Sequence, residues 1–181
     1  MARTIPINMP LIDEREVEAV TAVLRSGVLT GHSGRGPMVT RFEEAFAGFV
    51  GARHAVAVNS GTAALHMALL AAGVTQGDQV IVPSLTFVAT AEAVALAGAK
   101  PVFVDIDPQT YNINPTEIEE AVTEGTRAVV PVDLYGLSAD MGAVREAAQK
   151  HSLAVIEDAA QAHGALYRGR PPGSFAEMAC W

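Results

Sequence analysis

The sequence predicts an α/β protein of three layers, in which helices cover both faces of a mostly parallel sheet. From residue 54 onward, short runs rich in β-branched residues alternate with segments of helical periodicity, an order typical of this class. Runs such as Val80–Val82 and Ala128–Val130 are apolar throughout, as expected for parallel strands that helices cover on both sides. Polar residues directly follow the runs, and ligands bind at the carboxyl ends of strands in such sheets.

Two helices are expected before the alternating region. The first begins at Asp13, because Asp13 and Glu16 have the spacing of a capping box, and it ends at Gly27. The second follows Pro37 and ends at Gly51. Each carries a stripe of apolar residues, and aromatic stripes of this kind usually face a core. The stripes are Val17, Val20, Val23 and Leu24 in the first helix and Phe42, Phe46 and Phe49 in the second.

The alternating region supplies the strands and helices of the predicted sheet domain. The expected strands are His54–Val58, Gln79–Pro83, Pro101–Asp105, Arg127–Val132 and Leu153–Glu157. The expected helices are Thr62–Ala72, Phe87–Ala97, Pro115–Val122 and Met141–His151. The last residues, Met178–Trp181, have the composition of a further strand.

Composition excludes several classes of protein. The 181 residues carry 20 acidic and 12 basic side chains, a net charge of −8, which argues against a surface for nucleic acid or anionic membranes. No run reaches the roughly 20 apolar residues of a membrane span, and the first residues lack the apolar segment of a secretion signal, so a cytoplasmic protein is expected. Cys180 is the only cysteine, which excludes an internal disulfide and a structural zinc site built on several cysteines.

The segment Asn59–Thr62 is a candidate anion site, because it joins an expected strand to an expected helix. The N–H groups of a first helical turn have no partner within the helix and carry the positive end of its dipole. Gly61 would let a phosphate approach the backbone, and the hydroxyls of Ser60 and Thr62 would add donors. The alternative is that Ser60 or Thr62 only caps the helix.

Two carboxylates, an amide and an aromatic ring are the other candidate site residues. Because side chains alternate across a strand, only one of Glu157 and Asp158 can enter the site. A carboxylate in a largely apolar site needs a cation or good donors, so it is a candidate partner for a protonated ring nitrogen; the alternative is a cap at a strand end. Gln161 would offer an amide donor to a neighbouring oxygen. Phe87 could cover one face of a ring ligand, although a single phenylalanine is more often part of a core.

Three longer segments resemble one protein family. They are Asn59–Leu65, Pro83–Ala91 and Glu157–Gly164, and they resemble, in sequence and in separation, the pyridoxal phosphate-dependent sugar aminotransferases of the DegT/DnrJ/EryC1/StrS family. The resemblance covers nearly the whole chain. It implies that residues 37–181 are part of the large, pyridoxal phosphate-binding domain of the fold type I transferases, preceded by an N-terminal helix and loop in residues 1–36.

The same resemblance implies a role for each candidate. Gly61 and Thr62 would hold the phosphate of pyridoxal 5′-phosphate, and Phe87 would stack on its pyridine ring. Asp158 would pair with the ring nitrogen, and Gln161 would bond the ring hydroxyl oxygen. A protonated ring can accept the electrons that remain when the substrate Cα proton is removed.

The Schiff-base lysine of this family is expected beyond Trp181, after a strand that contains Ser-Phe. Lys100 and Lys150 are the only lysines of the sequence, and both are expected at the amino edge of the sheet, opposite the site. The chain is therefore expected to be the N-terminal portion of a longer enzyme, without the small C-terminal domain. Because the same lysine carries the proton in the reaction, this portion alone is expected to be inactive.

Four further residues keep open roles. The Gly31–Pro37 loop resembles the family loop near the active site and the dimer contact, so His32 or Arg35 could touch substrate phosphates or the partner subunit. His163 could be structural or functional. Many relatives have histidine where this chain has Asp133, so the role of this position stays open.

The resemblance implies a homodimeric enzyme that moves an amino group from an amino acid, glutamate, to a keto sugar attached to a nucleotide. A dehydratase or deoxygenase on the same scaffold, with another residue at the lysine position, is a related alternative. A non-catalytic α/β module that binds a phosphorylated ligand is an alternative from a different class. A sensor domain fused to a DNA-binding segment is a third, against which the net charge of −8 argues.

Overall fold

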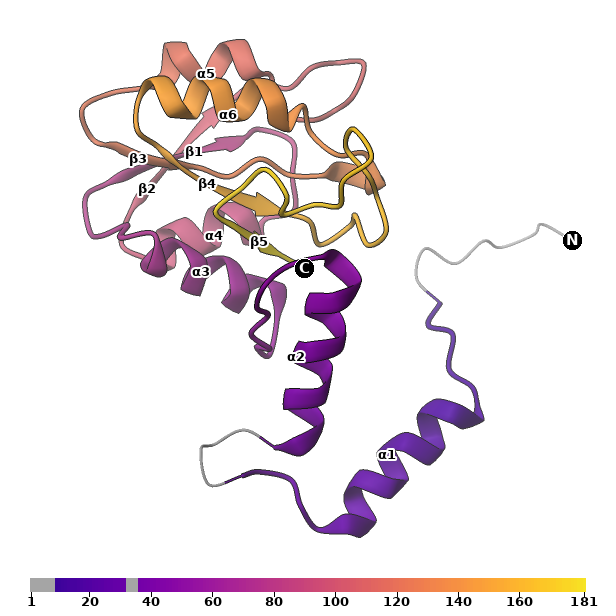
Figure 1. Cartoon of the computed structure of the whole chain (residues 1–181). Coiled ribbons are helices and arrows are strands. Elements are labelled where there is room, and N and C mark those ends of the chain that lie inside the picture. The colour runs from indigo at the N-terminus through magenta and orange to yellow at the C-terminus, as the bar shows by residue number, and fades with distance from the viewer. Residues whose placement is uncertain (1–8, 32–35) are drawn as a thin grey trace, which may run out of the picture.

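The computed structural model describes residues 9–31 and 36–181 (Figure 1), so His32 and Arg35 lie outside the described residues. The described strands run parallel in one sheet, in the order β2-β1-β3-β4-β5. The strands are β1 (Gln79–Pro83), β2 (Lys100–Val104), β3 (Thr126–Val129), β4 (Ala154–Asp158) and β5 (Met178–Cys180).

Helices cover both faces of this sheet: α3 and α4 lie on one face, and α5 and α6 lie on the other (Figure 1). The predicted three-layer α/β fold is therefore confirmed. The helices are α1 (Glu14–Ser26), α2 (Pro37–Val50), α3 (Gly61–Ala71), α4 (Ala89–Leu96), α5 (Pro115–Ala121) and α6 (Met141–Lys150), with a 3-10 turn, η1 (Leu134–Gly136).

Strand β1 shows how the sheet separates two cores. Val80 and Val82 belong to the cluster that includes α3 and α4, whereas Ile81 belongs to the cluster that includes α5 and α6. All three side chains are fully buried. Neighbouring residues of a strand point to opposite faces, so an uninterrupted apolar run is what a strand between two helical layers requires.

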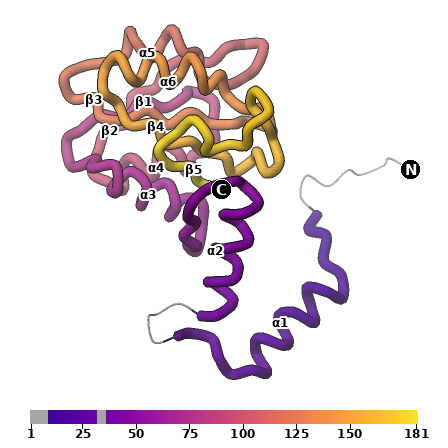
Figure 2. The backbone as a smooth tube through the Cα atoms, viewed as in Figure 1, coloured from indigo at the N-terminus to yellow at the C-terminus, as the bar shows by residue number. Residues whose placement is uncertain are grey.

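Helix α1 begins and ends as the sequence predicts. Asp13 is its N-cap: Oδ1 of Asp13 accepts the N–H of Arg15 at 2.8 Å, and the N–H of Asp13 donates to Glu16 Oε2 at 2.8 Å. Gly27 ends the helix with φ of 66°. No residue of α1 is buried, and the helix stands apart from the sheet (Figure 2), so its apolar stripe is not part of the core.

The phenylalanine stripe of α2 is only partly buried. Phe42 is 56% exposed and Phe49 is 63% exposed, so the expectation that they face the core is wrong. Phe46 is half-buried and packs edge-on against Trp181, with ring centroids 5.1 Å apart. The helix also contacts the rest of the fold through Glu43 and Val50, which are both buried.

The strand expected at His54–Val58 does not form. A strand needs a neighbour for its backbone hydrogen bonds, and within the described part of the chain no strand pairs with this segment. Val56 is 61% exposed, and the N–H of Ala57 donates to the side chain of Glu43 in α2 at 2.9 Å. The apolar run predicted burial correctly for other strands, but composition alone does not reveal whether a partner strand is present.

Strand β3 is shorter than the expected strand Arg127–Val132, because Pro131 has no N–H to continue the ladder. Beyond Pro131, Val132 forms an isolated bridge with Asp158. The other expected elements agree with the observed ones to about two residues at each end. None of the described helices is long and apolar enough to cross a membrane.

Candidate active site

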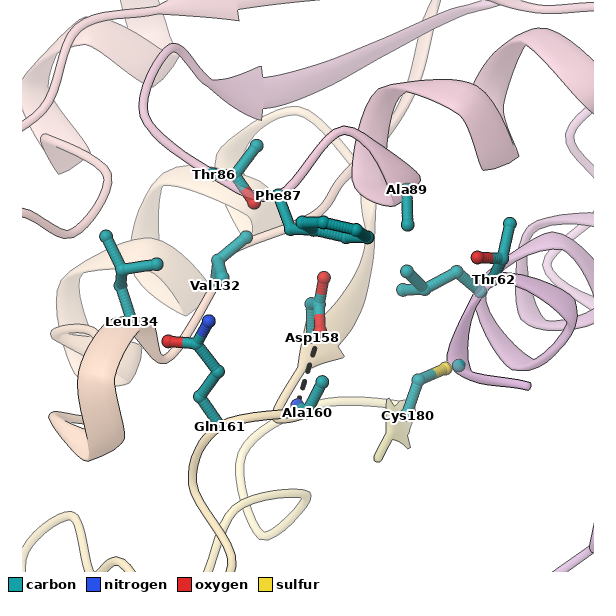
Figure 3. Close-up of a pocket in the computed structure, with 12 residues that line it drawn as sticks. Thr62, Thr86, Phe87, Ala89, Val132, Leu134, Asp158, Ala160, Gln161 and Cys180 are labelled. Atoms are coloured by element: carbon teal, nitrogen blue, oxygen red, sulfur yellow. Dashed lines mark hydrogen bonds between the residues drawn. The ribbon is translucent and has the colours of Figure 1, made fainter. Parts of the chain in front are cut away.

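A hollow opens at the carboxyl end of the sheet, beside the first turn of α3 (Figure 3). We call it the carboxyl-end pocket. Its volume is about 200 Å³, and a cavity of about 150 Å³ is sufficient for a benzene ring. It lies where ligands bind in open parallel sheets. The lining residues on which its chemistry depends are Gly61, Thr62, Thr86, Phe87, Asp158 and Gln161.

The first turn of α3 forms one wall of this pocket. Ser60 is the N-cap, and its Oγ accepts the N–H of Ala63 at 3.1 Å, so the capping that the sequence left as an alternative does occur. Gly61 and Thr62 line the pocket, whereas Ser60 is not among the lining residues. Among described atoms, a Cβ at Gly61 would meet the carbonyl oxygen of Trp181, at 3.8 Å. Packing within the protein therefore does not require a glycine there.

Asp158 and Glu157 point to opposite faces of β4, as strand alternation predicts. Asp158 enters the pocket (Figure 3) and is 7% exposed. Its Oδ2 accepts the hydroxyl of Thr90 at 2.9 Å, and its Oδ1 accepts the N–H of Ala160 at 3.3 Å. Burial raises the pKa of Asp158, and these two hydrogen bonds oppose the rise.

Phe87 lies just before α4, and its ring borders the pocket close to Asp158 (Figure 3). The side chain is 69% exposed. A phenylalanine this exposed is not part of a core, so the structural alternative for Phe87 does not apply. Its face is open to a flat ligand.

Gln161 is oriented by the main chain of Tyr135. The N–H of Tyr135 donates to Oε1 of Gln161 at 2.7 Å, so the amide nitrogen is the end that remains free to donate into the pocket (Figure 3). The role of Gln161 as a donor to a ligand stays a prediction. The contact with Tyr135 could not be predicted, because a main-chain N–H has no signature in a sequence.

Thr86 and Thr90 belong to the site although the sequence assigned neither of them a role. Their Oγ1 atoms lie 2.8 Å apart, Thr86 lines the pocket, and Thr90 is 1% exposed. Both lie in the segment Pro83–Ala91, and this was the available signal. The hydroxyl of Thr90 reaches Asp158, which lies 68 residues further along the chain, and that contact depends on the folded sheet.

On the opposite face of the sheet, Glu157 faces Asp133. Both are buried; Glu157 accepts the N–H of Gly173, and Asp133 accepts the N–H of Ala139 at 2.9 Å. Burial, reinforced by the charge of Asp133, raises the pKa of Glu157 to about 8, and burial also raises the pKa of Asp133. The pair therefore retains a proton at neutral pH. Neither residue lines the pocket, so Asp133 has no direct contact with a ligand bound there.

The two lysines lie away from the carboxyl-end pocket. Lys100 is the first residue of β2, at the amino edge of the sheet, and Nζ of Lys150, at the end of α6, lies 2.7 Å from Glu119. His163 contacts the ring of Phe46, with centroids 6.2 Å apart, and does not line the pocket. Within residues 9–31 and 36–181, no group of three or more His, Cys, Asp or Glu side chains could hold a metal ion.

Comparison with known proteins identifies the relatives of the chain. A profile of the DegT/DnrJ/EryC1/StrS aminotransferase family matches residues 10–181. The spore coat polysaccharide biosynthesis protein SpsC of Bacillus subtilis is 50% identical over 173 residues, which are 96% of this chain and 43% of that protein. The UDP-2-acetamido-2-deoxy-3-oxo-D-glucuronate aminotransferase of Pseudomonas aeruginosa is 50% identical over 145 residues, 80% of this chain and 40% of that protein.

The chain thus spans less than half the length of these relatives. Among solved structures, NtdA of Bacillus subtilis with bound cofactor PMP is similar with a TM-score of 0.83 and 40% identity, over 93% of this chain and 38% of that one. Sequence and fold agree along nearly the entire described chain. The chain therefore belongs to the DegT/DnrJ/EryC1/StrS aminotransferase family.

Proposed function

We propose that this chain is the cofactor-binding part of a pyridoxal phosphate-dependent aminotransferase that acts on a keto sugar attached to a nucleotide. The carboxyl-end pocket carries the proposal, because it combines a helix N-terminus, an exposed aromatic ring, an amide donor and a buried carboxylate. Family membership supports the reaction type. The PMP bound to NtdA supports the cofactor, since PMP is the aminated form of pyridoxal phosphate.

The charge at Asp158 is the first test of whether the residues fit this cofactor. Asp158 is buried, and in the part of the chain that the structure describes no Lys, Arg or His forms an ion pair with it. A buried carboxylate without a cation is costly, and the raised pKa of Asp158 reflects that cost. A protonated ring nitrogen would supply the missing positive charge.

The hydrogen bonds of the first turn of α3 are the second test. The N–H of Ala63 donates to the side chain of Ser60, and the N–H of Ala64 donates to its carbonyl oxygen. The N–H groups of Gly61 and Thr62 precede them and have no acceptor within a helix. They would bind the cofactor phosphate, with the positive end of the helix dipole behind them.

The remaining side chains would fix the ring between these two ends. When bound, the cofactor supplies an electron sink for the removal of the Cα proton from the amino donor. Asp158 would keep the ring nitrogen protonated, and Gln161 would donate its amide N–H to the ring hydroxyl oxygen. Phe87 would cover one face of the ring. The position of each side chain on the pocket wall supports its role.

Covalent attachment and proton transfer need a lysine, and we propose that it follows Trp181 in the complete enzyme. Lys100 and Lys150 lie too far from the pocket to replace it. We therefore expect the chain of 181 residues to bind the cofactor weakly, without a covalent bond, and not to transaminate. Borohydride reduction with pyridoxal phosphate, followed by peptide mass spectrometry, tests this. A stoichiometric lysine adduct would contradict it.

The substrate and the assembly are also proposals. The name of the Pseudomonas aeruginosa relative describes a UDP-linked 3-oxo sugar, which supports a nucleotide-linked keto sugar as the amino acceptor; we propose glutamate as the donor. We further propose a homodimer, supported by the exposed apolar stripe of α1, in which Val17, Val20 and Leu24 are 50%, 61% and 65% exposed. Sedimentation of the complete protein tests the dimer.

One assay separates the proposed function from its alternatives. The complete protein is incubated with glutamate and a UDP-linked 3-oxo sugar, and 2-oxoglutarate and amino sugar are measured. Transamination yields the two products in equal amounts. A dehydratase would change the sugar without consuming glutamate, and a non-catalytic binding module would do neither and would show no cofactor absorbance.

A further inference from the structure

Two threonine hydroxyls, those of Thr86 and Thr90, form a hydrogen-bonded series that ends at the carboxylate of Asp158. Oγ1 of Thr90 lies 2.9 Å from Oδ2 of Asp158, and Oγ1 of Thr86 lies 2.8 Å from Oγ1 of Thr90. Thr90 is 1% exposed, Thr86 is half-buried, and Thr86 lines the carboxyl-end pocket. The two hydroxyls therefore run from the pocket wall to the carboxylate.

The direction of these hydrogen bonds follows from the donors available. An ionised carboxylate only accepts, and a threonine hydroxyl has one proton to donate. Thr90 must use its proton for Asp158, so in its contact with Thr86 it must be the acceptor. Thr86 therefore donates to Thr90, and both protons are directed toward Asp158.

Each oxygen of Asp158 has its own donor from a separate segment. Oδ1 accepts the N–H of Ala160, in the turn after β4, at 3.3 Å, and Oδ2 accepts from Thr90, in α4. Two donors from two segments restrict rotation of the carboxylate. Loss of the Thr90 hydroxyl would leave Asp158 with the longer of these two bonds, and it would remove a donor that stabilises the charged form.

We propose that Thr90 is a positioning residue for the aminotransferase: with Thr86 behind it, Thr90 holds Asp158 in the orientation that meets the ring nitrogen of the cofactor. The inference rests on the proposed function, because it requires a ring nitrogen opposite Asp158. A threonine with a purely structural role would affect folding, but it would not affect how the protein distinguishes a ring with a nitrogen from one without.

The test compares pyridoxal phosphate with its 1-deaza analogue, in which a C–H replaces the ring nitrogen. Dissociation constants for both are measured on the complete protein, freed of cofactor, as wild type and as Thr90→Val, Thr90→Ser and Thr86→Val. The matched control is Thr126→Val, a buried threonine at the start of β3, at the opposite edge of the sheet.

We expect wild type and Thr126→Val to bind pyridoxal phosphate about tenfold or more tightly than the 1-deaza analogue. This ratio corresponds to the loss of one charge-assisted hydrogen bond. Thr90→Val should lose most of this preference, Thr90→Ser should retain it, and Thr86→Val should lose part of it. If Thr90→Val does not fold, the other two variants decide, because only the loss in Thr86→Val together with retention in Thr90→Ser supports the hydroxyl chain.

Two outcomes would overturn the inference, and they differ in what else they overturn. If wild type prefers pyridoxal phosphate and the valine variants keep that preference, Thr90 does not position Asp158, and the proposed function stands. If wild type itself does not distinguish the two compounds, Asp158 does not face a ring nitrogen, and the proposed function fails together with the inference.

Discussion

Glu157 and Asp158 are neighbours in β4, yet their carboxyl groups lie in separate environments on opposite faces of the sheet. Asp158 lines the carboxyl-end pocket and accepts a hydrogen bond from Thr90, whereas Glu157 faces Asp133 and accepts a hydrogen bond from Gly173. Substitution of Glu157 should therefore change the pH dependence of stability without changing ligand chemistry, whereas substitution of Asp158 should change ligand chemistry.

Glu157→Gln is expected to flatten the dependence of the unfolding free energy on pH between about 5 and 8. The folded pKa of Glu157 is about 8, above its ordinary value of 4.5, so the folded state binds the extra proton. The stability that this proton contributes is complete below the pKa of Glu157 in the unfolded chain. It is lost as the pH rises toward 8, by up to about 1.4 kcal/mol per pH unit. Urea unfolding at several pH values measures the slope.

The control for that slope is Glu146→Gln, because Glu146 is an exposed carboxylate on α6. This variant should keep the wild-type slope. Raised pKa values at Asp133 and Asp158 leave some slope in every variant. Parallel curves for wild type and Glu157→Gln would show that Glu157 does not hold the proton.

Asp158→Ala is expected to abolish turnover in the complete enzyme while the protein stays folded. The substitution removes the proposed charge partner of the ring nitrogen, and this loss would weaken the electron sink. It also removes a buried carboxylate without a cation but leaves the donor groups of Thr90 and Ala160 unpaired, so the opposed effects should keep the change in stability within about 2 kcal/mol. Circular dichroism measures the folding of the variant, and a turnover assay measures its activity.

The control is Asp105→Ala, at the carboxyl end of β2 and outside the pocket, which should remain active. Turnover by Asp158→Ala would contradict the assignment.

Gly61→Ala is expected to weaken phosphate binding without weakening the fold. The nearest described atom to a new Cβ is a carbonyl oxygen at 3.8 Å, and alanine favours a helix over glycine by up to about 1 kcal/mol. The methyl group would instead obstruct the approach of a phosphate to the turn. We expect the affinity for pyridoxal phosphate to fall by about tenfold, or about 1.4 kcal/mol, and the affinity for pyridoxal, which has no phosphate, to stay unchanged.

Fluorescence titration with both compounds measures this difference. The matched control is Gly48→Ala in α2, where a new Cβ meets no described atom within 4 Å; it should change neither affinity. Equal losses for pyridoxal phosphate and pyridoxal would mean that the methyl group disturbs the ring rather than the phosphate.

Gln161→Glu is expected to convert a donor at the ring hydroxyl into an acceptor. One oxygen of the new carboxylate can still accept the N–H of Tyr135, as Oε1 does now, and the other would face the ring hydroxyl oxygen. The ring hydroxyl should then keep its proton, so its pKa in the bound cofactor should rise. A pH titration of the bound cofactor's absorbance measures it. Gln149→Glu, on the exposed side of α6, should leave that pKa unchanged, and an unchanged value in Gln161→Glu would exclude the contact.

The features that the sequence predicts correctly are those that depend on local periodicity. The capping box of Asp13 and Glu16 fixes the start of α1, and strand alternation separates Glu157 from Asp158. Val80–Val82 is apolar throughout because both faces of β1 are covered. In each case the pattern that predicts the feature lies within a few consecutive residues.

The features that could not be predicted depend on what lies beside a segment after folding. Val56 belongs to an apolar run, but no described strand pairs with it. The stripe of α1 has helical spacing, but spacing does not reveal whether a surface covers it. The hydroxyl of Thr90 reaches Asp158 only in the folded sheet, and Gln161 is oriented by a main-chain N–H. Such contacts are set by tertiary structure.

The carboxyl-end pocket draws its lining from residues as distant in sequence as Gly61 and Cys180. A ligand in this hollow can be gripped only when β4 and β5 have docked beside α3. The fraction of protein that binds cofactor should therefore report the fraction that has the native topology, since an incomplete or misfolded polypeptide would not bind it. By mass action, bound cofactor would also stabilise the folded sheet domain against unfolding.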